Sequence, residues 1–226
     1  MRDVHGHGSG FSFGSIEAIV GCMFSGKTEE LMRLLRRAQY AKQRFQVFKP
    51  RIDDRYDVEC VASHNRALMA STVIDRAEDI YQHLRPETQV VGIDEGQFFD
   101  DELVDVVSEL AGRGLRLIVA GLDLDWKGEP FRPMPDLMAI AERVTKLQAV
   151  CVACGAPATR TQRLSSSDAE VLVGDVATYE ARCRPCHEPF DPSMSRSDRM
   201  DLATTAPSLR SAERGLFAET DLSCRR

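Results

Sequence analysis

The sequence lacks several features that would define whole classes of protein. No apolar run approaches the length needed to cross a membrane, and no apolar secretion-signal core opens the chain. Positive charge is not in excess, because 35 Asp and Glu residues outnumber 29 Lys and Arg residues, giving a formal net charge of −6 at pH 7. Such a balance is poorly suited to neutralising nucleic-acid phosphates. We therefore expect a cytoplasmic protein that has neither a membrane nor a nucleic acid as its partner.

The sequence contains no internal repeat either. Its 226 residues suffice for one core of about 150 residues and a small additional module. A content of 43% apolar and 28% charged residues is typical of soluble globular proteins. The seven cysteines include two C-x-x-C pairs and, by count, one thiol without a partner, which favours a reducing cytoplasm.

The pattern G-x-x-x-x-G-K-[ST] is matched at every fixed position by Gly21-Cys-Met-Phe-Ser-Gly-Lys-Thr28. The mostly apolar residues 16–20 predict a strand before this loop, and the apolar spacing of residues 28–42 predicts a helix after it. The glycines let backbone N–H groups face phosphate oxygens, and the helix N-terminus adds partial positive charge. A chance glycine turn is the alternative, but the flanking strand and helix favour a nucleoside triphosphate site. The predicted ATP-binding residues of the loop are Gly21, Met23, Phe24, Ser25, Gly26, Lys27 and Thr28.

Two acidic residues, Asp94 and Glu95, follow a second apolar strand at residues 89–93. An aspartate at the end of such a strand commonly supports the Mg²⁺ of a P-loop enzyme, to which the Thr28 hydroxyl would also bind. Lys27 would reach the outer phosphates. Glu95 would orient water in an ATPase, or accept a hydroxyl proton in a kinase. A solvent-exposed acidic turn is the alternative interpretation.

Four cysteines form two C-x-x-C pairs, Cys151 with Cys154 and Cys183 with Cys186. Two such pairs predict a tetrahedral zinc site with four thiolates, which leaves no open position and is therefore structural. A redox-active dithiol is the alternative, although it would need only one pair. His187 could replace one ligand, but an ordinary exposed histidine is the simpler interpretation. The zinc would close the loop of residues 155–182 at its base and limit its disorder.

Strand and helix patterns alternate along the chain. This alternation predicts an α/β fold with a mostly parallel sheet covered by helices on both faces. The remaining expected strands are residues 45–48 and 115–120, with a break at Lys49-Pro50. The remaining expected helices are residues 75–84, 101–111 and 137–146.

Four motifs in one order resemble the cytosolic, zinc-containing (type II) thymidine kinase family. They are Gly-x-Met-Phe-Ser-Gly-Lys-Thr, Ile-Asp-Glu-Gly-Gln-Phe-Phe, Gly121-Leu-Asp-Leu-Asp-Trp126 with Pro130-Phe131, and Tyr179-Glu-Ala-Arg-Cys183-Arg-x-Cys186-His187. The resemblance covers about residues 15–190. It implies a P-loop NTPase-type fold with a small zinc-ribbon-like subdomain that carries a substrate loop.

The resemblance also implies an activity. Members of the family transfer the γ-phosphoryl group of ATP, with Mg²⁺, to the 5′-hydroxyl of thymidine or deoxyuridine, in nucleotide salvage for DNA synthesis. Most are homotetramers that are inhibited by thymidine triphosphate. By motif, Glu95 would be the general base, and Asp53, Arg55 and Arg163 would support the phosphate side.

The implied nucleoside pocket combines apolar walls with loop backbone that hydrogen-bonds the base. Trp126 departs from the family, which usually has Phe at that position, and core packing is the alternative role for Met23, Phe98 and Leu122. The implied substrate-binding residues are Met23, Phe98, Leu122, Trp126, Phe131, Leu172, Val173, Gly174 and Tyr179.

These features divide the chain into four expected segments. Residues 15–150 would form the P-loop kinase domain, and residues 151–190 the zinc-binding subdomain with its substrate loop. The glycine- and histidine-rich residues 1–14 are expected to form a flexible extension. Residues 191–226, rich in Ser, Arg and Asp, are expected to form a disordered tail.

Two other function classes share some of these motifs. A P-loop ATPase with a zinc ribbon, acting on nucleic acid, would use Glu95 to activate water. The negative charge and the absence of a basic stripe studded with aromatic residues argue against it. A GTPase switch would need an N-K-x-D segment to read guanine, and the sequence contains none.

Overall fold

The computed structural model describes residues 14–51, 60–62, 68–164 and 178–188. The chain divides into two units, residues 1–190 and 191–226, and the second lies wholly outside the described residues. The expectations for the tail at 191–226, and for all of the N-terminal extension except Gly14, therefore concern residues that the structure does not describe. No helix within the described ranges is both long and apolar enough to span a membrane.

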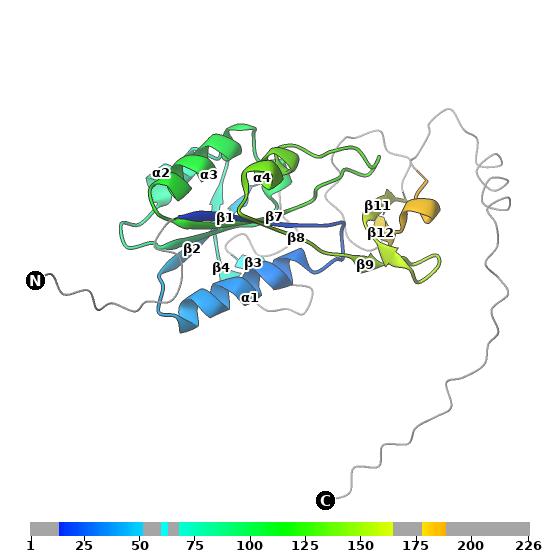
Figure 1. The fold of residues 1–226 in the computed structure, drawn as a ribbon, viewed down its shortest axis with the longest axis horizontal. Coiled ribbons are helices and arrows are strands. Elements are labelled where there is room, and N and C mark those ends of the chain that lie inside the picture. Colours follow the sequence, from blue (N-terminus) through cyan, green and yellow to red (C-terminus); the bar gives the residue numbers. More distant parts are fainter. Residues whose placement is uncertain (1–13, 52–59, 63–67, 165–177, 189–226) are drawn as a thin grey trace, which may run out of the picture. The chain divides into compact units, whose positions relative to one another are not determined.

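A six-stranded sheet with the order β5-β2-β6-β7-β1-β8 forms the centre of the first unit (Figure 1). All of its strand pairs are parallel, which confirms the predicted α/β class. Strands β1, β6 and β7 are buried along almost their whole length, as expected when helices cover both faces of a parallel sheet. The strands are β1 Ser15–Val20, β2 Phe45–Pro50, β5 Thr72–Ile74, β6 Val90–Ile93, β7 Arg116–Gly121 and β8 Arg143–Lys146.

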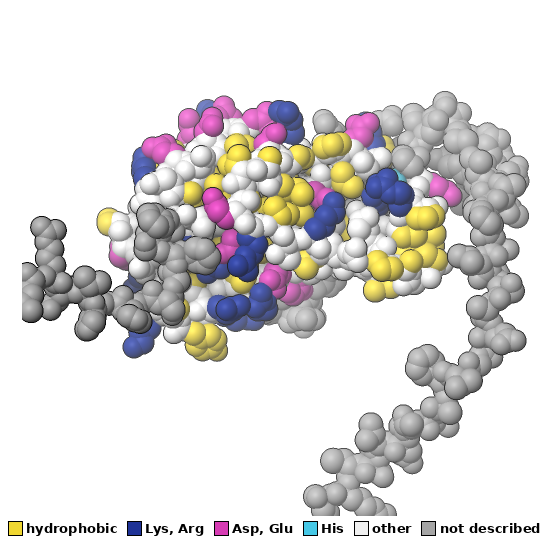
Figure 2. All heavy atoms as spheres, viewed as in Figure 1, with side chains coloured by type: hydrophobic (Ala, Val, Ile, Leu, Met, Phe, Trp, Pro, Cys, Tyr) yellow, Lys and Arg dark blue, Asp and Glu magenta, His cyan; other side chains and the backbone are white. Residues whose placement is uncertain are grey.

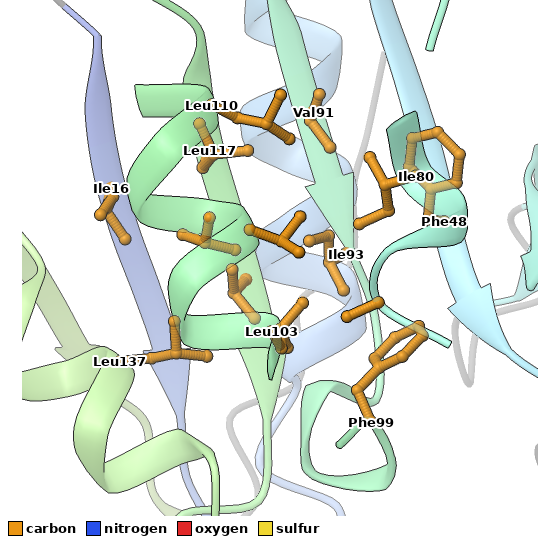
Figure 3. Close-up of a cluster of buried hydrophobic side chains, with 14 of the residues drawn as sticks. Ile16, Phe48, Ile80, Val91, Ile93, Phe99, Leu103, Leu110, Leu117 and Leu137 are labelled. Carbon is orange, nitrogen blue, oxygen red and sulfur yellow. The ribbon is translucent and has the colours of Figure 1, made fainter. Parts of the chain in front are cut away.

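Helices lie on both faces of this sheet. Helix α1 (Lys27–Tyr40) covers one face, and α2 (Asp79–His83), α3 (Glu102–Gly112) and α4 (Met134–Ile140) cover the other (Figure 1). Two buried apolar clusters separate the helices from the sheet, and Figure 3 shows Leu110 of α3 near Leu117 of β7 in the larger one. Because all six strands are parallel, the segments that follow β1, β6 and β7 emerge at one edge of the sheet.

The predicted helix over residues 137–146 is wrong in its second half. Helix α4 ends at Ile140, and Arg143–Lys146 forms the edge strand β8, which pairs with β1. The segment is rich in helix-forming residues such as Ala141, Glu142 and Lys146, so local propensity favoured the helix. The unpaired edge of β1 decides the outcome, because it offers backbone hydrogen bonds that a local pattern cannot reveal. The break expected at Lys49-Pro50 also lies further along, since β2 continues to Pro50.

A second, smaller lobe follows β8, and we call residues 149–164 and 178–188 the cysteine lobe. It consists of two short antiparallel pairs and one 3-10 turn, η2 (Arg184–Cys186). The pairs are β9 (Ala149–Val150) with β10 (Pro157–Ala158), and β11 (Arg160–Arg163) with β12 (Tyr179–Arg182). The loop predicted over residues 155–182 therefore includes β10, β11 and β12, and its middle lies outside the described residues. A further short pair joins β3 (Cys60–Ala62) to β4 (Leu68–Ala70).

Candidate active site and metal centre

The glycine loop turns tightly between the end of β1 and the start of α1. Gly26 has φ 86° and immediately precedes the helix, which begins at Lys27. Gly21 has φ 149°, and a Cβ there would lie 2.6 Å from the Leu147 carbonyl oxygen. A side chain would therefore collide with backbone, so glycine is required at the start of the loop. This geometry is the strand–loop–helix arrangement that the sequence predicted.

Inside the loop, polar groups converge on one carbonyl. The Ser25 N–H donates to the Cys22 carbonyl at 3.3 Å, and the Lys27 ammonium donates to the same oxygen at 3.0 Å. The Lys27 charge is therefore held against the loop itself, at the N-terminus of α1. A helix N-terminus with an adjacent ammonium group suits an anion such as a phosphate.

The segment after β6 brings a carboxylate to this loop. The Thr28 hydroxyl donates to Asp94 Oδ2 at 3.0 Å, and Asp94 Oδ1 accepts the Glu95 N–H at 3.0 Å. Burial and the neighbouring Glu95 charge raise the pKa of the Asp94 carboxyl to about 7, despite the Thr28 hydrogen bond. Carboxylate and hydroxyl oxygens are ligands that Mg²⁺ prefers, and a cation would offset the cost of ionising a buried acid. These residues therefore fit the predicted Mg²⁺.

Glu95 lies in a left-handed backbone conformation, with φ 51°, at the start of the 3-10 turn η1 (Gly96–Phe98). Its carboxylate Oε2 accepts a hydrogen bond from Gln97 Nε2 at 2.6 Å. The other end of the same amide, Gln97 Oε1, accepts the Leu122 N–H at 2.8 Å from the segment after β7. The sequence prediction missed Gln97, although it lies within the Ile-Asp-Glu-Gly-Gln-Phe-Phe motif that carried the resemblance.

Four thiols converge in the cysteine lobe, from Cys151, Cys154, Cys183 and Cys186, with all Sγ atoms within 4.8 Å of one another. Burial raises the pKa of the Cys151 thiol, but backbone hydrogen bonds outweigh it and bring that pKa to about 6. A hydrogen bond with Cys183 raises the pKa of Cys186 to about 12. One thiolate is thus favoured at Cys151, and a dication would favour ionisation of Cys183 and Cys186, whose pKa values are raised. The donor set fits zinc, and because both pairs meet in one cluster, a redox role for a single pair is less suitable.

The cysteine lobe also contacts the glycine loop directly. The Cys22 thiol donates to the Ala158 carbonyl at 3.3 Å, and the Met23 N–H donates to the Thr161 hydroxyl oxygen at 3.0 Å. Cys22 belongs to the same buried cluster as Cys151 and Cys183. The candidate phosphate loop and the candidate zinc site are therefore parts of one packed region.

A family model and a curated relative both match most of the chain. The model of the family described as Thymidine kinase matches residues 14–187. A thymidine kinase of Bdellovibrio bacteriovorus is 59% identical over 176 residues, which cover 78% of this chain and 86% of that relative. The chain belongs to the thymidine kinase family.

Among solved structures, the Legionella pneumophila ATPase DotB is similar at a TM-score of 0.36 and 17% sequence identity. The likeness spans 56% of this chain but only 34% of that chain. At this level it says nothing about what this member of the thymidine kinase family does.

The aromatic residues implied by the family resemblance form two contacts. Phe98 and Phe131 meet edge to face, with ring centroids 6.1 Å apart and planes at 85°. The Arg163 guanidinium lies 4.3 Å from the centroid of the Trp126 ring, and it donates to the Tyr179 hydroxyl at 3.1 Å. A cation held against an indole face and a phenol has a fixed orientation. Arg163 is therefore buried in an aromatic setting that its sequence motif did not indicate.

His187 differs from its expected role. Its Nε2 lies 3.0 Å from the Trp126 carbonyl oxygen, to which it donates, and its ring is half-buried, so it is not an ordinary exposed histidine. Burial lowers its pKa, so the neutral ring is favoured. The cysteine cluster is complete without it.

Five residues that the family resemblance implies lie outside the described residues. They are Asp53, Arg55, Leu172, Val173 and Gly174. Their assigned roles on the phosphate side and at the thymine edge remain predictions.

Proposed function

We propose that this chain transfers the γ-phosphoryl group of ATP to the 5′-hydroxyl of thymidine, or of deoxyuridine, giving dTMP and ADP in nucleotide salvage for DNA synthesis. The proposal is carried by one observation: a chain of the thymidine kinase family places its P-loop against Asp94 and Glu95 at one edge of a parallel sheet. Phosphoryl transfer asks a protein mainly for positioning and charge stabilisation, which such an edge supplies.

On the phosphate side, the loop N–H groups and Lys27 bind the triphosphate, and Thr28 with Asp94 holds Mg²⁺. The metal would neutralise charge on the phosphate oxygens. Of the two arginines assigned to the phosphate side, Arg163 is the one that lies within the described residues. Asp53 and Arg55 would complete the phosphate side. The support is the 3.0 Å bond between Thr28 and Asp94, which joins the glycine loop to the metal-binding carboxylate.

Glu95 accepts the proton of the 5′-hydroxyl as the nucleoside oxygen attacks phosphorus. Its backbone is anchored at both sides, because its N–H bonds to Asp94 and its carbonyl accepts the Phe98 N–H at 3.0 Å. The carboxylate projects from a tight turn beside the P-loop, a suitable position for a general base.

Thymine is bound by apolar and aromatic walls, with backbone groups of residues 172–174 at its edge. A flat base needs ring contacts on its faces and fixed polar groups at its rim. The supporting observation is that Phe98 and Leu122 extend from the two segments that Gln97 joins beside Glu95. The walls are Met23, Phe98, Leu122, Trp126, Phe131 and Tyr179.

Zinc on the four cysteines fixes the base of the 165–177 segment, because β11 and β12 lead into it from both sides. The domain boundaries that we propose, 15–150 and 151–190, divide the P-loop kinase domain from this zinc-binding part. Homotetramer formation, inhibition by thymidine triphosphate and a cytoplasmic location belong to the same proposal and are supported by the family alone.

The main competitor is an ATPase that acts on nucleic acid. On the face shown in Figure 2, acidic and basic side chains are interspersed, whereas a nucleic-acid surface gathers basic ones. One assay separates the two functions: incubation with ATP, Mg²⁺ and thymidine, followed by chromatography for dTMP, beside ATP hydrolysis with and without DNA. Formation of dTMP with DNA-independent turnover is expected. ATP hydrolysis stimulated by DNA, without dTMP, would overturn the proposal.

A further inference from the structure

Gln97 is a buried polar side chain that neither the phosphate site nor the metal centre accounts for. It is 3% exposed, and both ends of its amide are engaged. Nε2 lies 2.6 Å from Glu95 Oε2, and Oε1 lies 2.8 Å from the Leu122 nitrogen. It therefore links the candidate base to the candidate pocket wall across two separate segments.

The chemistry of the partners fixes the orientation of this amide. The Leu122 N–H can only donate, so the glutamine oxygen must face it, and the NH₂ group must then face Glu95. Glu95 Oε2 is thus the acceptor of this hydrogen bond. A glutamate at position 97 would keep the acceptor for Leu122 but place a second carboxylate against Glu95.

Close packing holds the amide in place. A Cβ at Gly121 would lie 2.8 Å from Gln97 Oε1 and 2.7 Å from Met134 Sδ. A Cβ at Gly96 would lie 2.8 Å from Val119 Cγ1. A side chain at Gly96 would press on Val119 of β7, and one at Gly121 would displace the Gln97 amide. The absence of both side chains lets the two segments approach closely enough for one amide to bridge them.

We propose that Gln97 is a positioning residue, which aims the Glu95 carboxylate at the 5′-hydroxyl and, through the Leu122 backbone, sets the nucleoside pocket relative to that carboxylate. The inference rests on the proposed function, in which Glu95 is the general base. It predicts that one side chain controls two kinetic quantities: kcat through Glu95, and KM for thymidine through Leu122.

Two substitutions separate these effects. Gln97→Glu keeps the acceptor for Leu122 and removes the donor to Glu95, so kcat should fall about 10- to 100-fold while KM for thymidine stays within about 3-fold. Gln97→Met removes both groups, so kcat should fall similarly and KM for thymidine should rise several-fold. In both variants the acid limb of the kcat–pH profile should move to higher pH, because the carboxylate loses a donor that stabilised its charge.

Gln46 supplies a matched control. It is also a buried glutamine, at 7% exposure, and its amide bonds to the backbone of His83 and Arg85 and to Thr88 Oγ1. Gln46→Met should lower the melting temperature comparably to Gln97→Met but leave the acid limb and KM for thymidine unchanged. If Gln97→Met does not fold, Gln97→Glu and its pH profile decide the matter.

A double-mutant cycle with Glu95→Gln tests whether Gln97 acts through the base. The kcat cost of Gln97→Met should shrink to about 3-fold or less when Glu95 is already replaced. A full cost in that background, or a Gln97→Glu variant with wild-type kcat and pH profile, overturns the inference. Failure of the proposed function is a different result, because the wild-type protein would then form no dTMP, whereas a Glu95→Gln variant with nearly wild-type kcat would remove the general base and overturn the inference with it.

Discussion

The sheet lobe, by which we mean the described residues from 14 to 148, and the cysteine lobe are stabilised in different ways. Between the strands and helices of the sheet lobe lie large apolar side chains such as Phe48, Ile93 and Leu117, all fully buried. The buried cluster of the cysteine lobe consists of alanines and cysteines, with Cys22 from the glycine loop. Its valines Val150 and Val152 remain 68% and 62% exposed. A lobe this small buries little apolar area of its own, and its four-cysteine cluster could hold a metal ion that would add to its stability.

The two lobes nevertheless meet where the chemistry is expected. Ala158 and Thr161 of the cysteine lobe bond to the glycine loop, and Arg163 lies over the ring of Trp126. The cysteine lobe, which has the smaller apolar core, therefore contacts the glycine loop of the sheet lobe, where the phosphates are expected to bind. Order in the cysteine lobe should influence the phosphate loop as well as the nucleoside pocket.

Zinc removal should have the largest effect, and it should loosen the cysteine lobe and the contacts of that lobe with the glycine loop while the sheet stays folded. The purified protein should contain about one zinc per chain, and its chelation should remove on the order of 10 kcal/mol of folding free energy from that lobe. Hydrogen exchange should then rise over residues 149–164 and 178–188, whereas β6 and β7 stay protected.

Cysteine variants provide the control for the zinc prediction. Cys183→Ser should lose zinc and weaken nucleoside binding, whereas Cys22→Ala should keep about one zinc per chain. Fully active, reduced protein without zinc would contradict this prediction, because the cysteine lobe would then need no metal.

Glu95→Gln should have the next largest effect, and it should leave both lobes folded. Loss of the general base should lower kcat by about 10²- to 10⁴-fold, while ATP binding, zinc content and melting temperature stay close to wild type. Steady-state kinetics with a nucleotide-binding titration would measure this. A variant within a few-fold of wild type would mean that positioning alone suffices for transfer.

Matched leucine truncations should sharpen the contrast between the two lobes. Leu35 is fully buried between α1 and the sheet, so Leu35→Ala should reduce the free energy of unfolding by about 2–5 kcal/mol. Leu164 at the end of β11 is 51% exposed, and Leu164→Ala should cost about 0.5 kcal/mol or less. Denaturant unfolding measures both values. Equal costs would show that the cysteine lobe has an apolar core of its own.

Trp126 should have a smaller effect than Leu35, and it reports on the junction of the lobes. It is the only tryptophan, and it meets Arg163 and His187 of the cysteine lobe. Thymidine should shift its fluorescence, Trp126→Phe should stay active, and Trp126→Ala should lose about 1–3 kcal/mol of nucleoside binding. Adenosine serves as the control nucleoside. Unchanged emission during thymidine turnover, with normal binding by Trp126→Ala, would place the pocket elsewhere.

Local chemistry in the sequence was enough to predict the glycine loop, the alternating strands and helices, and the four-cysteine cluster. Gly21 and Gly26 mark backbone conformations that their loop requires, and the C-x-x-C spacing puts two thiols within reach of one metal. Apolar runs such as residues 89–93 identified buried strands because a parallel sheet covered on both faces needs them. For such features the physical cause lies within a few neighbouring residues.

Only the tertiary structure decided the features that depend on distant partners. Residues 143–146 form a strand because the edge of β1 lies beside them, although the residues just before them favour a helix. Gln97 joins Glu95 to Leu122, and His187 bonds to Trp126, across 25 and 61 residues of chain. Hydrogen bonds of this kind leave no period or spacing in the sequence. They form because the folded sheet and the cysteine lobe bring these groups together where water is excluded and each must find a partner.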